Sequence, residues 1–350
     1  MGSSKTQRMV TIRDVARAAS VSIATASRAM NDSDLVTPET RDRVRDAAGR
    51  LHYTPHTGAR SLITRRTHTI GILLPDLYGE FFSEIIRGID QAAQQAGFHC
   101  LVSSARHTGP PLEAALRSMR GRVDGLILMS PEFTGELSRR TMPLGFPVVL
   151  VHCPPTDLAY DSLMIANAEG ARAMVQHLAG LGHRRIAIIR GAEGNFDAAE
   201  RLRGYREALA ASGLPADPTL EAPGDFGEAS GAAAARALMT LPGPPTAIFA
   251  ANDCMAIGAL SALRDSGYRV PDDVALGGFD DIPMARYMTP TLTSVHVDIS
   301  ALGAKAAERV LKALLYPTDR TPSREVLPTT LVIRQSCGAR TTTSGGTQHE

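Results

Sequence analysis

The 350-residue sequence contains no tryptophan, only 5% aromatic residues and only four cysteines. The cysteines are Cys100, Cys153, Cys254 and Cys337, which are far apart and show no paired spacing. This pattern argues against a disulfide framework and against a cysteine-ligated metal site. We expect free thiols in a reducing compartment, no metal and no cofactor.

Long apolar runs are also missing. The longest candidates, such as Ile70 to Leu74 and Val148 to Val151, have the length of a β-strand, whereas a membrane-spanning helix needs about 20 apolar residues. Residues 1–8 are polar and lack the apolar core of a signal peptide. We therefore expect a cytoplasmic protein without a membrane partner.

The charges nearly cancel over the chain, giving a net charge of +1, but they are unevenly distributed. Residues 1–66 hold 12 Lys or Arg against 6 Asp or Glu, a net charge of +6, and the remainder holds 25 against 30, a net charge of −5. A small basic module on a mildly acidic body is typical of a unit that binds a polyanion.

Residues 10–53 are predicted to form three short helices. Thr11 is placed to cap the first helix, Ser22 the second, and Thr37, which precedes a proline, the third. Small apolar residues permit a close crossing of the first two helices. The positions predicted to line the inside of that crossing are Ile12, Val15, Ala16, Ala19, Val21, Ala26 and Ala29.

The exposed face of the second helix is expected to carry Ser22, Ile23, Thr25, Ser27 and Arg28. Serine and threonine hydroxyls suit phosphates and base edges, and an arginine suits phosphate or guanine. On the pattern alone, the alternative is an ordinary helical hairpin with a solvated face.

From residue 68 onward, short β-rich runs alternate with helical segments. Such alternation predicts parallel sheets covered by helices on both faces, and the series is long enough for two similar, doubly wound lobes. Ligands of such folds lie beyond the carboxyl ends of strands, and two lobes provide a natural cleft. The predicted strands are 69–74, 99–103, 125–129, 147–151, 185–189, 246–250, 274–278 and 331–334. The predicted helices are 81–96, 111–120, 168–181, 199–212, 227–241, 254–266 and 301–315.

The strings Thr11-Ile-Arg-Asp-Val-Ala, Val21-Ser and Thr25-Ala-Ser-Arg-Ala-Met-Asn resemble the headpiece signature of the lactose/galactose-repressor family of bacterial transcription regulators. The resemblance extends to about residue 337. It implies an all-α helix-turn-helix headpiece and an α/β two-lobed core like that of periplasmic binding proteins, with doubly wound parallel sheets. The implied segments are a DNA-binding headpiece (1–54), a hinge helix and linker (55–67), an effector-binding and dimerisation domain (68–337) and a disordered tail (338–350).

The resemblance makes the second helix the recognition helix, with Ile23 and Ala24 where the family reads bases. A segment around Leu62 is similar to the family's hinge helix, whose leucine opens a base step from the minor groove; a lone apolar linker residue is the alternative for Leu62. Two positions depart from the family pattern, Ala26 in place of a more usual valine and His56 in place of a common asparagine. The implied DNA contacts are Thr11, Ser22, Ile23, Ala24, Thr25, Ser27, Arg28, Asn31, Ala59 and Leu62.

Four segments of the body, beginning at residues 181, 200, 250 and 277, are similar to the family's effector-domain signatures. The implied effector contacts are the polar Arg201, Asn252 and Asp280, with Phe81 and Phe226 as apolar walls. Each polar residue also has a structural alternative: a surface arginine, a helix N-cap and a turn cap, respectively.

Two positions of the body depart from the family pattern. Where some members have Asp, or another polar group, this chain has His152 and Ala166, so its ligand is expected to differ from those of the familiar sugar repressors.

The implied function is transcriptional repression, with operator affinity controlled by a small metabolite, a sugar or sugar derivative; whether it releases or strengthens DNA binding stays open. The implied partners are a pseudo-palindromic double-stranded operator, the effector and a second copy of the chain. A dimer rather than a tetramer is expected, because residues 341–350 contain no apolar heptad. Catalytic motifs are not apparent, which disfavours an enzyme. A secreted binding protein is disfavoured by the basic headpiece.

Overall fold

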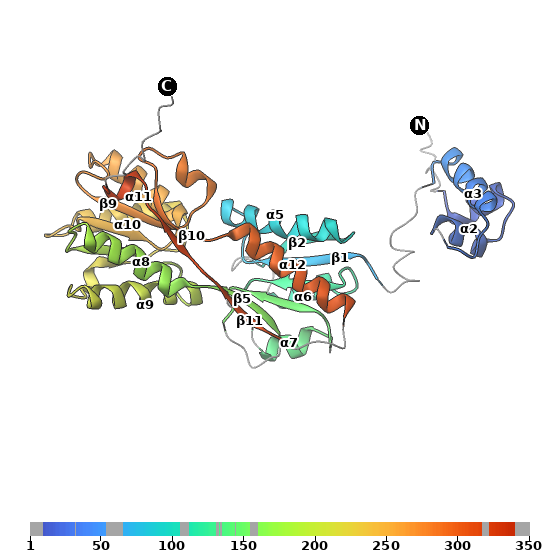
Figure 1. Cartoon of the computed structure of the whole chain (residues 1–350), viewed down its shortest axis with the longest axis horizontal. Coiled ribbons are helices and arrows are strands. Elements are labelled where there is room, and N and C mark those ends of the chain that lie inside the picture. The colour runs from blue at the N-terminus through green and yellow to red at the C-terminus, as the bar shows by residue number, and fades with distance from the viewer. Residues whose placement is uncertain are drawn as a thin grey trace, which may run out of the picture. The chain divides into compact units, whose positions relative to one another are not determined.

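The computed structural model describes residues 10–31, 33–53, 66–105, 112–130, 133, 135–143, 145–154, 160–316 and 322–339. The chain divides into two compact units, residues 1–67 and residues 68–350 (Figure 1). The predicted hinge contacts Ala59 and Leu62, and the tail from residue 340, lie outside the described residues. The four segment boundaries inferred from the family resemblance stay predictions.

The first unit contains three helices, α1 (Ile12–Ala18), α2 (Ile23–Met30) and α3 (Pro38–Arg50), each of which begins directly after its predicted cap. Their first turns leave backbone N–H groups without helical acceptors, and side chains supply the acceptors. The Oγ of Ser22 accepts from the backbone N–H of Thr25 at 3.0 Å, and the carboxylate of Asp14 accepts from the backbone N–H of Thr11 at 3.0 Å. Thr37 caps α3 in the same way as Ser22 caps α2.

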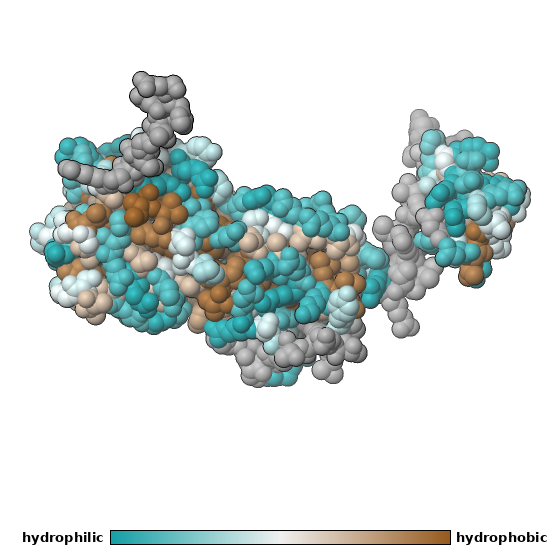
Figure 2. All heavy atoms as spheres, in the orientation of Figure 1, coloured by the Kyte–Doolittle hydropathy of each residue, from teal (hydrophilic) through white to brown (hydrophobic). Residues whose placement is uncertain are grey.

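The interior of this unit consists of small apolar side chains, which let the helices approach closely. The visible surface around them is mostly hydrophilic (Figure 2). Ala26 is completely buried, so the position where the family more often has valine belongs to the packed core. The buried side chains are Val15, Ala16, Ala19, Ala26, Ala29, Val36, Val44, Ala47 and Ala48.

The second unit is built on two six-stranded sheets of similar topology, one in each lobe. In both sheets the strands run parallel, except that β12 pairs antiparallel with β10. The first sheet, in the order in which its strands pair, is β11 (Arg324–Leu327), β5 (Asp161–Ile165), β4 (Val148–Val151), β3 (Gly125–Leu128), β1 (Thr69–Leu74) and β2 (His99–Ser104). The second is β12 (Thr330–Val332), β10 (Thr293–His296), β9 (Ala275–Asp280), β8 (Ala247–Ala250), β6 (Ile186–Ile189) and β7 (Glu221–Ala222).

Helices cover both faces of each sheet, as the alternating pattern predicted. The helices of the first lobe are α5 (Glu80–Gln95), α6 (Leu112–Met119), α7 (Gly135–Thr141) and α12 (Ile299–Leu315). Those of the second lobe are α8 (Asn167–Gly180), α9 (Phe196–Ala211), α10 (Glu228–Met239) and α11 (Asp253–Asp265), with the short 3-10 turns η1 (Pro218–Leu220), η2 (Pro283–Arg286) and η3 (Gln335–Cys337). The sequence-based prediction missed α7 and the strands β5, β7, β10 and β11.

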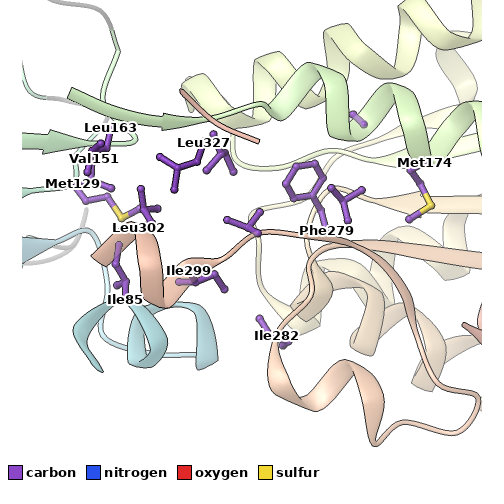
Figure 3. Close-up of a cluster of buried hydrophobic side chains, with 14 of the residues drawn as sticks. Ile85, Met129, Val151, Leu163, Met174, Phe279, Ile282, Ile299, Leu302 and Leu327 are labelled. Atoms are coloured by element: carbon purple, nitrogen blue, oxygen red, sulfur yellow. The ribbon is translucent and has the colours of Figure 1, made fainter. Parts of the chain in front are cut away.

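The chain passes between the lobes three times, near residues 166, 297 and 328, so each lobe contains separate stretches of sequence. A continuous cluster of buried apolar side chains accompanies these crossings. Figure 3 shows Ile85 and Leu302 in the first lobe, Phe279 in the second, and Ile299 and Ile282 between them. One hydrophobic cluster therefore continues from lobe to lobe, and each lobe has a further cluster of its own.

Glycines allow the helix pairs of this unit to touch backbone to backbone, and α10 and α11 provide the clearest case. A Cβ at Gly258 of α11 would overlap the backbone carbonyl of Glu228 on α10. We expect Gly258→Ala to lower the free energy of unfolding by about 3 kcal/mol, since the obstacle is backbone and overpacking costs about 1–3 kcal/mol or more. Gly180→Ala is the matched control, because a Cβ there meets nothing within 4 Å. Urea denaturation of the full chain measures both, and equal stabilities would contradict the close crossing.

Candidate functional site

The exposed face of α2 carries most of the residues predicted to contact DNA. Ser22, Ile23, Ala24 and Arg28 are exposed, with Ile23 at 47%, and Thr25 and Ser27 are half-buried. A single exposed apolar side chain is common on protein surfaces, so this face is distinguished by its hydroxyl groups and by Arg28. Arg28 forms no ion pair within the described part of the chain, so its guanidinium is available to a phosphate or a base.

The two predicted contacts at the edges of this face also have structural roles. Thr11 is exposed and precedes α1 as its N-cap. Asn31 ends α2, where its side-chain amide donates to the backbone carbonyl of Ser27 at 2.8 Å. Thr11 thus fixes the start of α1, and Asn31 fixes the end of α2.

Ser22 combines a cap with a position on the exposed face, and this can be tested. Ser22→Ala and Thr37→Ala should each lower the stability of the first unit by about 1 kcal/mol, because each removes an N-cap acceptor. Ser22→Ala is also expected to weaken binding to a DNA duplex selected from a random library, and by more than its loss of stability accounts for. Thr37→Ala is not expected to weaken this binding. Fluorescence anisotropy at a temperature where both variants are folded decides this. Equal affinities in the two variants would remove Ser22 from the interface.

In the second unit, predicted effector contacts lie where strands end. Asp280 is the last residue of β9, Asn252 follows β8, and Phe81 lies in the first turn of α5 after β1. His152 follows β4 in the same way. These are the carboxyl ends of parallel strands, where ligands of doubly wound folds bind.

Backbone strain is concentrated at this place. Phe226 has φ 73°, His152 φ 52°, and the neighbours Asp280 and Asp281 have φ 101° and 55°. Residues with side chains rarely adopt positive φ, and such conformations persist where the surroundings hold them, often at functional sites. The strain therefore supports the placement of a site here.

Arg201 is the centre of a buried polar network. It is 4% exposed, which excludes the alternative of a surface arginine. Its Nε donates to Oδ1 of Asn167 at 2.8 Å, its Nη1 donates to the backbone carbonyl of Ala251, and its Nη2 forms an ion pair with Oδ1 of Asp280 at 3.2 Å. The guanidinium also lies over the ring of Phe279, 3.8 Å from its centroid, so its position is fixed from several sides.

The network continues to the first lobe. Asn167 also donates to Oδ1 of Asp197 at 2.7 Å, and Oδ2 of Asp197 is 2.7 Å from Nδ1 of His152. Because Asp197 belongs to α9 and His152 follows β4, this contact joins the two lobes. A second inter-lobe contact runs from the backbone N–H of Met284 to the carboxylate of Glu80 at 2.8 Å.

The predicted aromatic residues flank this network. The ring of Phe81 meets the ring of His152 edge-on, with centroids 5.9 Å apart. The ring of Phe226 is 5.9 Å from the guanidinium carbon of Arg201. Asn252 caps α11 by accepting from the N–H of Met255 at 2.9 Å, as its structural alternative predicted, and it also donates to the carbonyl of Phe226 at 3.0 Å.

The carboxyl groups here are perturbed by burial and by one another. Burial raises the pKa of Asp280 to about 6, although the charges of Arg201 and His152 oppose this shift. Burial, with the charge of Asp280 added, raises the pKa of Asp253 well above its usual value. Burial alone would also raise the pKa of Asp197, but the charge and hydrogen bond of His152, with Arg201 and Asn167, make the net shift downward. Carboxyls with shifted pKa values in one cluster are typical of functional sites.

Comparison with known proteins gives the family. Residues 11–56 match bacterial regulatory proteins of the lacI family, and residues 175–337 match the periplasmic binding protein-like domain. The chain is 37% identical to the HTH-type transcriptional regulator CelR of Thermobifida fusca, over 94% of this chain and 99% of the relative. This chain belongs to the lacI family.

Two solved structures of this family cover nearly the whole chain. The lac repressor dimer bound to operator and the anti-inducer ONPF superposes with a TM-score of 0.84 at 29% identity, covering 95% of this chain and all of that one. The complex of CelR with cellobiose superposes with a TM-score of 0.71 at 35% identity, covering 93% and 99%. The predicted fold class, a helix-turn-helix headpiece with a two-lobed α/β core, is confirmed, and the chain is a transcriptional regulator.

In this lacI-family chain, sequence reasoning identified Arg201 and Asp280 but missed Asp197 and Asn167. Both missed residues lie in helices, Asn167 directly after Ala166 and Asp197 four residues before Arg201. The available signal was a polar residue near the start of each helix, among small residues. Helices on a protein surface often show the same pattern. His152 was identified only as a departure from the family, without its partner.

The described residues contain no group of three or more His, Cys, Asp or Glu side chains placed to hold a metal ion. Among the same residues, no helix is long and apolar enough to span a membrane.

Proposed function

We propose that this lacI-family regulator is a repressor that binds a pseudo-palindromic operator as a homodimer and changes its operator affinity when a small, hydroxylated metabolite binds between the lobes of residues 68–337. The division of the chain carries this proposal: a separate basic unit exposes the α2 face, and a second unit holds a buried polar network at its strand ends. Each part suits one partner, DNA or effector. The direction of the coupling is left open.

Relatives support both halves of the proposal. One solved relative is the lac repressor dimer bound to operator, and others carry cellobiose or ribose. The ribose operon repressor of Haemophilus influenzae is 32% identical over 94% of this chain. We infer a sugar or sugar derivative as effector, contacted by Arg201, Asn252 and Asp280 with Phe81 and Phe226 as walls.

The second unit has an apolar surface that is a candidate for the dimer interface. Leu77 and Tyr78, before α5, and Met284 and Tyr287, in and after η2, are exposed at 44%, 69%, 45% and 76%. The Glu80–Met284 contact places these two segments close together. Apolar side chains gathered on one surface suit burial against a second copy. Two copies would present two α2 faces to the two half-sites of the operator.

We infer that the protein is not an enzyme and acts in the cytoplasm, where the operator is. The acidic side chains of the network are engaged by Arg201, Asn167 and His152, an arrangement suited to holding a ligand rather than to transferring protons. The relatives that match 94% of this chain are a transcriptional regulator and an operon repressor.

The experiment is selection of duplexes from a random library with the full chain, followed by anisotropy with and without sugars. We expect an enriched palindromic sequence, binding by a dimer, and a shift in affinity with one sugar. By linkage, that sugar must then bind with an affinity that DNA changes by the same factor. Enrichment of no sequence would contradict the proposed function.

Arg28 is expected to contribute directly to operator binding. Arg28→Ala should weaken specific binding by about 1–3 kcal/mol if the guanidinium contacts a base. If it contacts phosphate, the loss should be similar on all sequences and the salt dependence should become shallower. Arg43→Ala, the same charge change on an exposed part of α3, is the control. Unchanged binding by Arg28→Ala on every duplex would place Arg28 outside the interface.

A further inference from the structure

His152 differs from the other polar residues of the network, because one of its two ring nitrogens is engaged and the other is not. Nδ1 is 2.7 Å from the carboxylate of Asp197. Nε2 is buried and has no hydrogen-bond partner among the residues that the structure describes. The residue as a whole is 5% exposed. A buried polar atom without a partner is unfavourable, and a ligand that supplies the partner removes this disadvantage.

The bond to Asp197 occupies Nδ1 and leaves Nε2 for a ligand. Burial raises the pKa of Asp197, but the charge and hydrogen bond of His152 and the neighbouring Arg201 and Asn167 lower it overall, so the carboxylate is ionised at neutral pH and can only accept. Nδ1 must therefore carry the proton. Nε2 is the remaining polar atom of the ring, and a ligand hydroxyl, which can both donate and accept, can pair with it.

The charges near His152 disfavour an acidic ligand. The carboxylates of Asp197 and Asp280 both interact with His152. Arg201 is engaged by Asn167, Ala251 and Asp280, and a further anion would compete with that set.

Arg190, directly after β6, has a buried Nε without a partner in the described part of the chain. The charges that act most strongly on Asp197 and Asp280 nevertheless come from His152 and Arg201. Arg190 is therefore the cation with which an acidic ligand would have to pair.

We propose that His152 selects the effector: an uncharged molecule forms a hydroxyl hydrogen bond with Nε2 while Asp197, from the opposite lobe, holds the ring. This assignment rests on the proposed function, in which an effector binds between the lobes. Phe81, edge-on to the ring, provides an apolar surface beside the bound hydroxyl. Because Nε2 has no accessible surface, the lobes must separate to admit the ligand and close around it.

The first experiment is a thermal-shift panel on the full chain at pH 7.5. The panel pairs glucose with glucuronate and galactose with galacturonate, and adds ribose and cellobiose. We expect stabilisation by an uncharged member and none by its acid counterpart. Stabilisation by the acids alone, abolished in Arg190→Ala, would overturn the proposal in favour of an anion site.

The second experiment measures the affinity of the best stabiliser by calorimetry with two variants of His152. His152→Asn keeps an N–H that can reach Asp197 but has no atom in place of Nε2, and we expect at least tenfold weaker binding. His152→Gln places an amide near the Nε2 position and should lose less. His183→Asn is the control, since His183 bonds Thr246 at a different place in the second lobe. Unchanged affinity in a folded His152→Asn protein would overturn the proposal.

Ligand binding and DNA binding by the full chain can be measured separately. If no member of the panel stabilises the protein, the assignment of an uncharged hydroxylated ligand is wrong. Binding of the same preparation to its selected duplex would show that the proposed regulatory function still holds. Absence of that DNA binding would instead contradict the proposed function.

Discussion

Replacing Arg201 with alanine is expected to lower the free energy of unfolding of the second unit by about 3–5 kcal/mol, the cost of leaving one partner of a buried ion pair alone. Asp280, 7% exposed in its side chain, would lose its cationic partner, and Asn167 would lose a donor. Response to any effector should be lost at the same time, because the network positions every polar contact proposed for it. Circular dichroism is the suitable probe of urea unfolding, since the chain has no tryptophan.

The matched control is Arg203→Ala on the same helix. Arg203 is 48% exposed and pairs with Glu200 and Glu207 on the surface, where such pairs contribute about 0–1 kcal/mol. If both variants lost the same stability, the interior role of Arg201 would be wrong.

The Arg201→Ala deficit should also depend on pH. The pKa of Asp280 is raised to about 6 by burial, with Arg201 opposing the shift. Without Arg201 this pKa rises further, so above pH 6 the variant lacks the stabilisation that the ion pair gives to the ionised carboxylate of the wild type. As pH falls through 6, Asp280 becomes protonated in both proteins and the difference between them should shrink. A deficit that grows toward pH 5 would contradict the assignment of the lost partner.

Removal of residues 1–67 is expected to abolish operator binding, by at least about 1,000-fold, the usual margin between specific and non-specific affinity. The deleted part contains the α2 face and the whole excess of basic residues, and the remaining chain has a net negative charge that repels DNA. The remainder should keep its ligand affinity, since the network lies entirely within the second unit.

The control is the Arg28→Ala full chain, which keeps the first unit and loses one contact. Anisotropy on the selected duplex and calorimetry with the sugar test both activities on the same preparations. Tight operator binding by the truncated protein would contradict the placement of the DNA interface, and loss of its ligand affinity would contradict the independence of the sugar site.

Local signals made the helices of the first unit predictable. A hydroxyl before each of α2 and α3, a proline at the start of α3 and small apolar residues at helical spacing all lie within a few positions of one another. The buried strands β1, β4, β6 and β8 were equally clear, because continuous apolar runs of strand length mark them.

The missed strands lack such runs. β10 has the sequence Thr-Ser-Val-His, and its polar side chains are satisfied by partners distant in sequence, such as Asp253, which accepts from the hydroxyl of Ser294 at 2.6 Å. β11 is an edge strand with an exposed valine at Val326. Both are specified by tertiary pairing rather than by local pattern.

The candidate site was predictable to the extent that family motifs mark it. Asp280 and Arg201 carried such motifs, but their direct ion pair could not be inferred from positions 79 residues apart. The His152–Asp197 contact was beyond reach for a further reason. It connects two lobes, and nothing in either segment indicates how the lobes face each other.

The three passages of the chain between the lobes have a mechanical consequence. Three backbone connections between the same two lobes form a hinge: they can bend together, but they resist separation or sliding of the lobes. The easiest motion of the lobes is therefore rotation about a common axis. A single protease cut in one connection should leave the lobes attached. Ligand binding would then rotate one lobe relative to the other, with little change in the distance between them, and the amino-terminal end of the second unit would change direction.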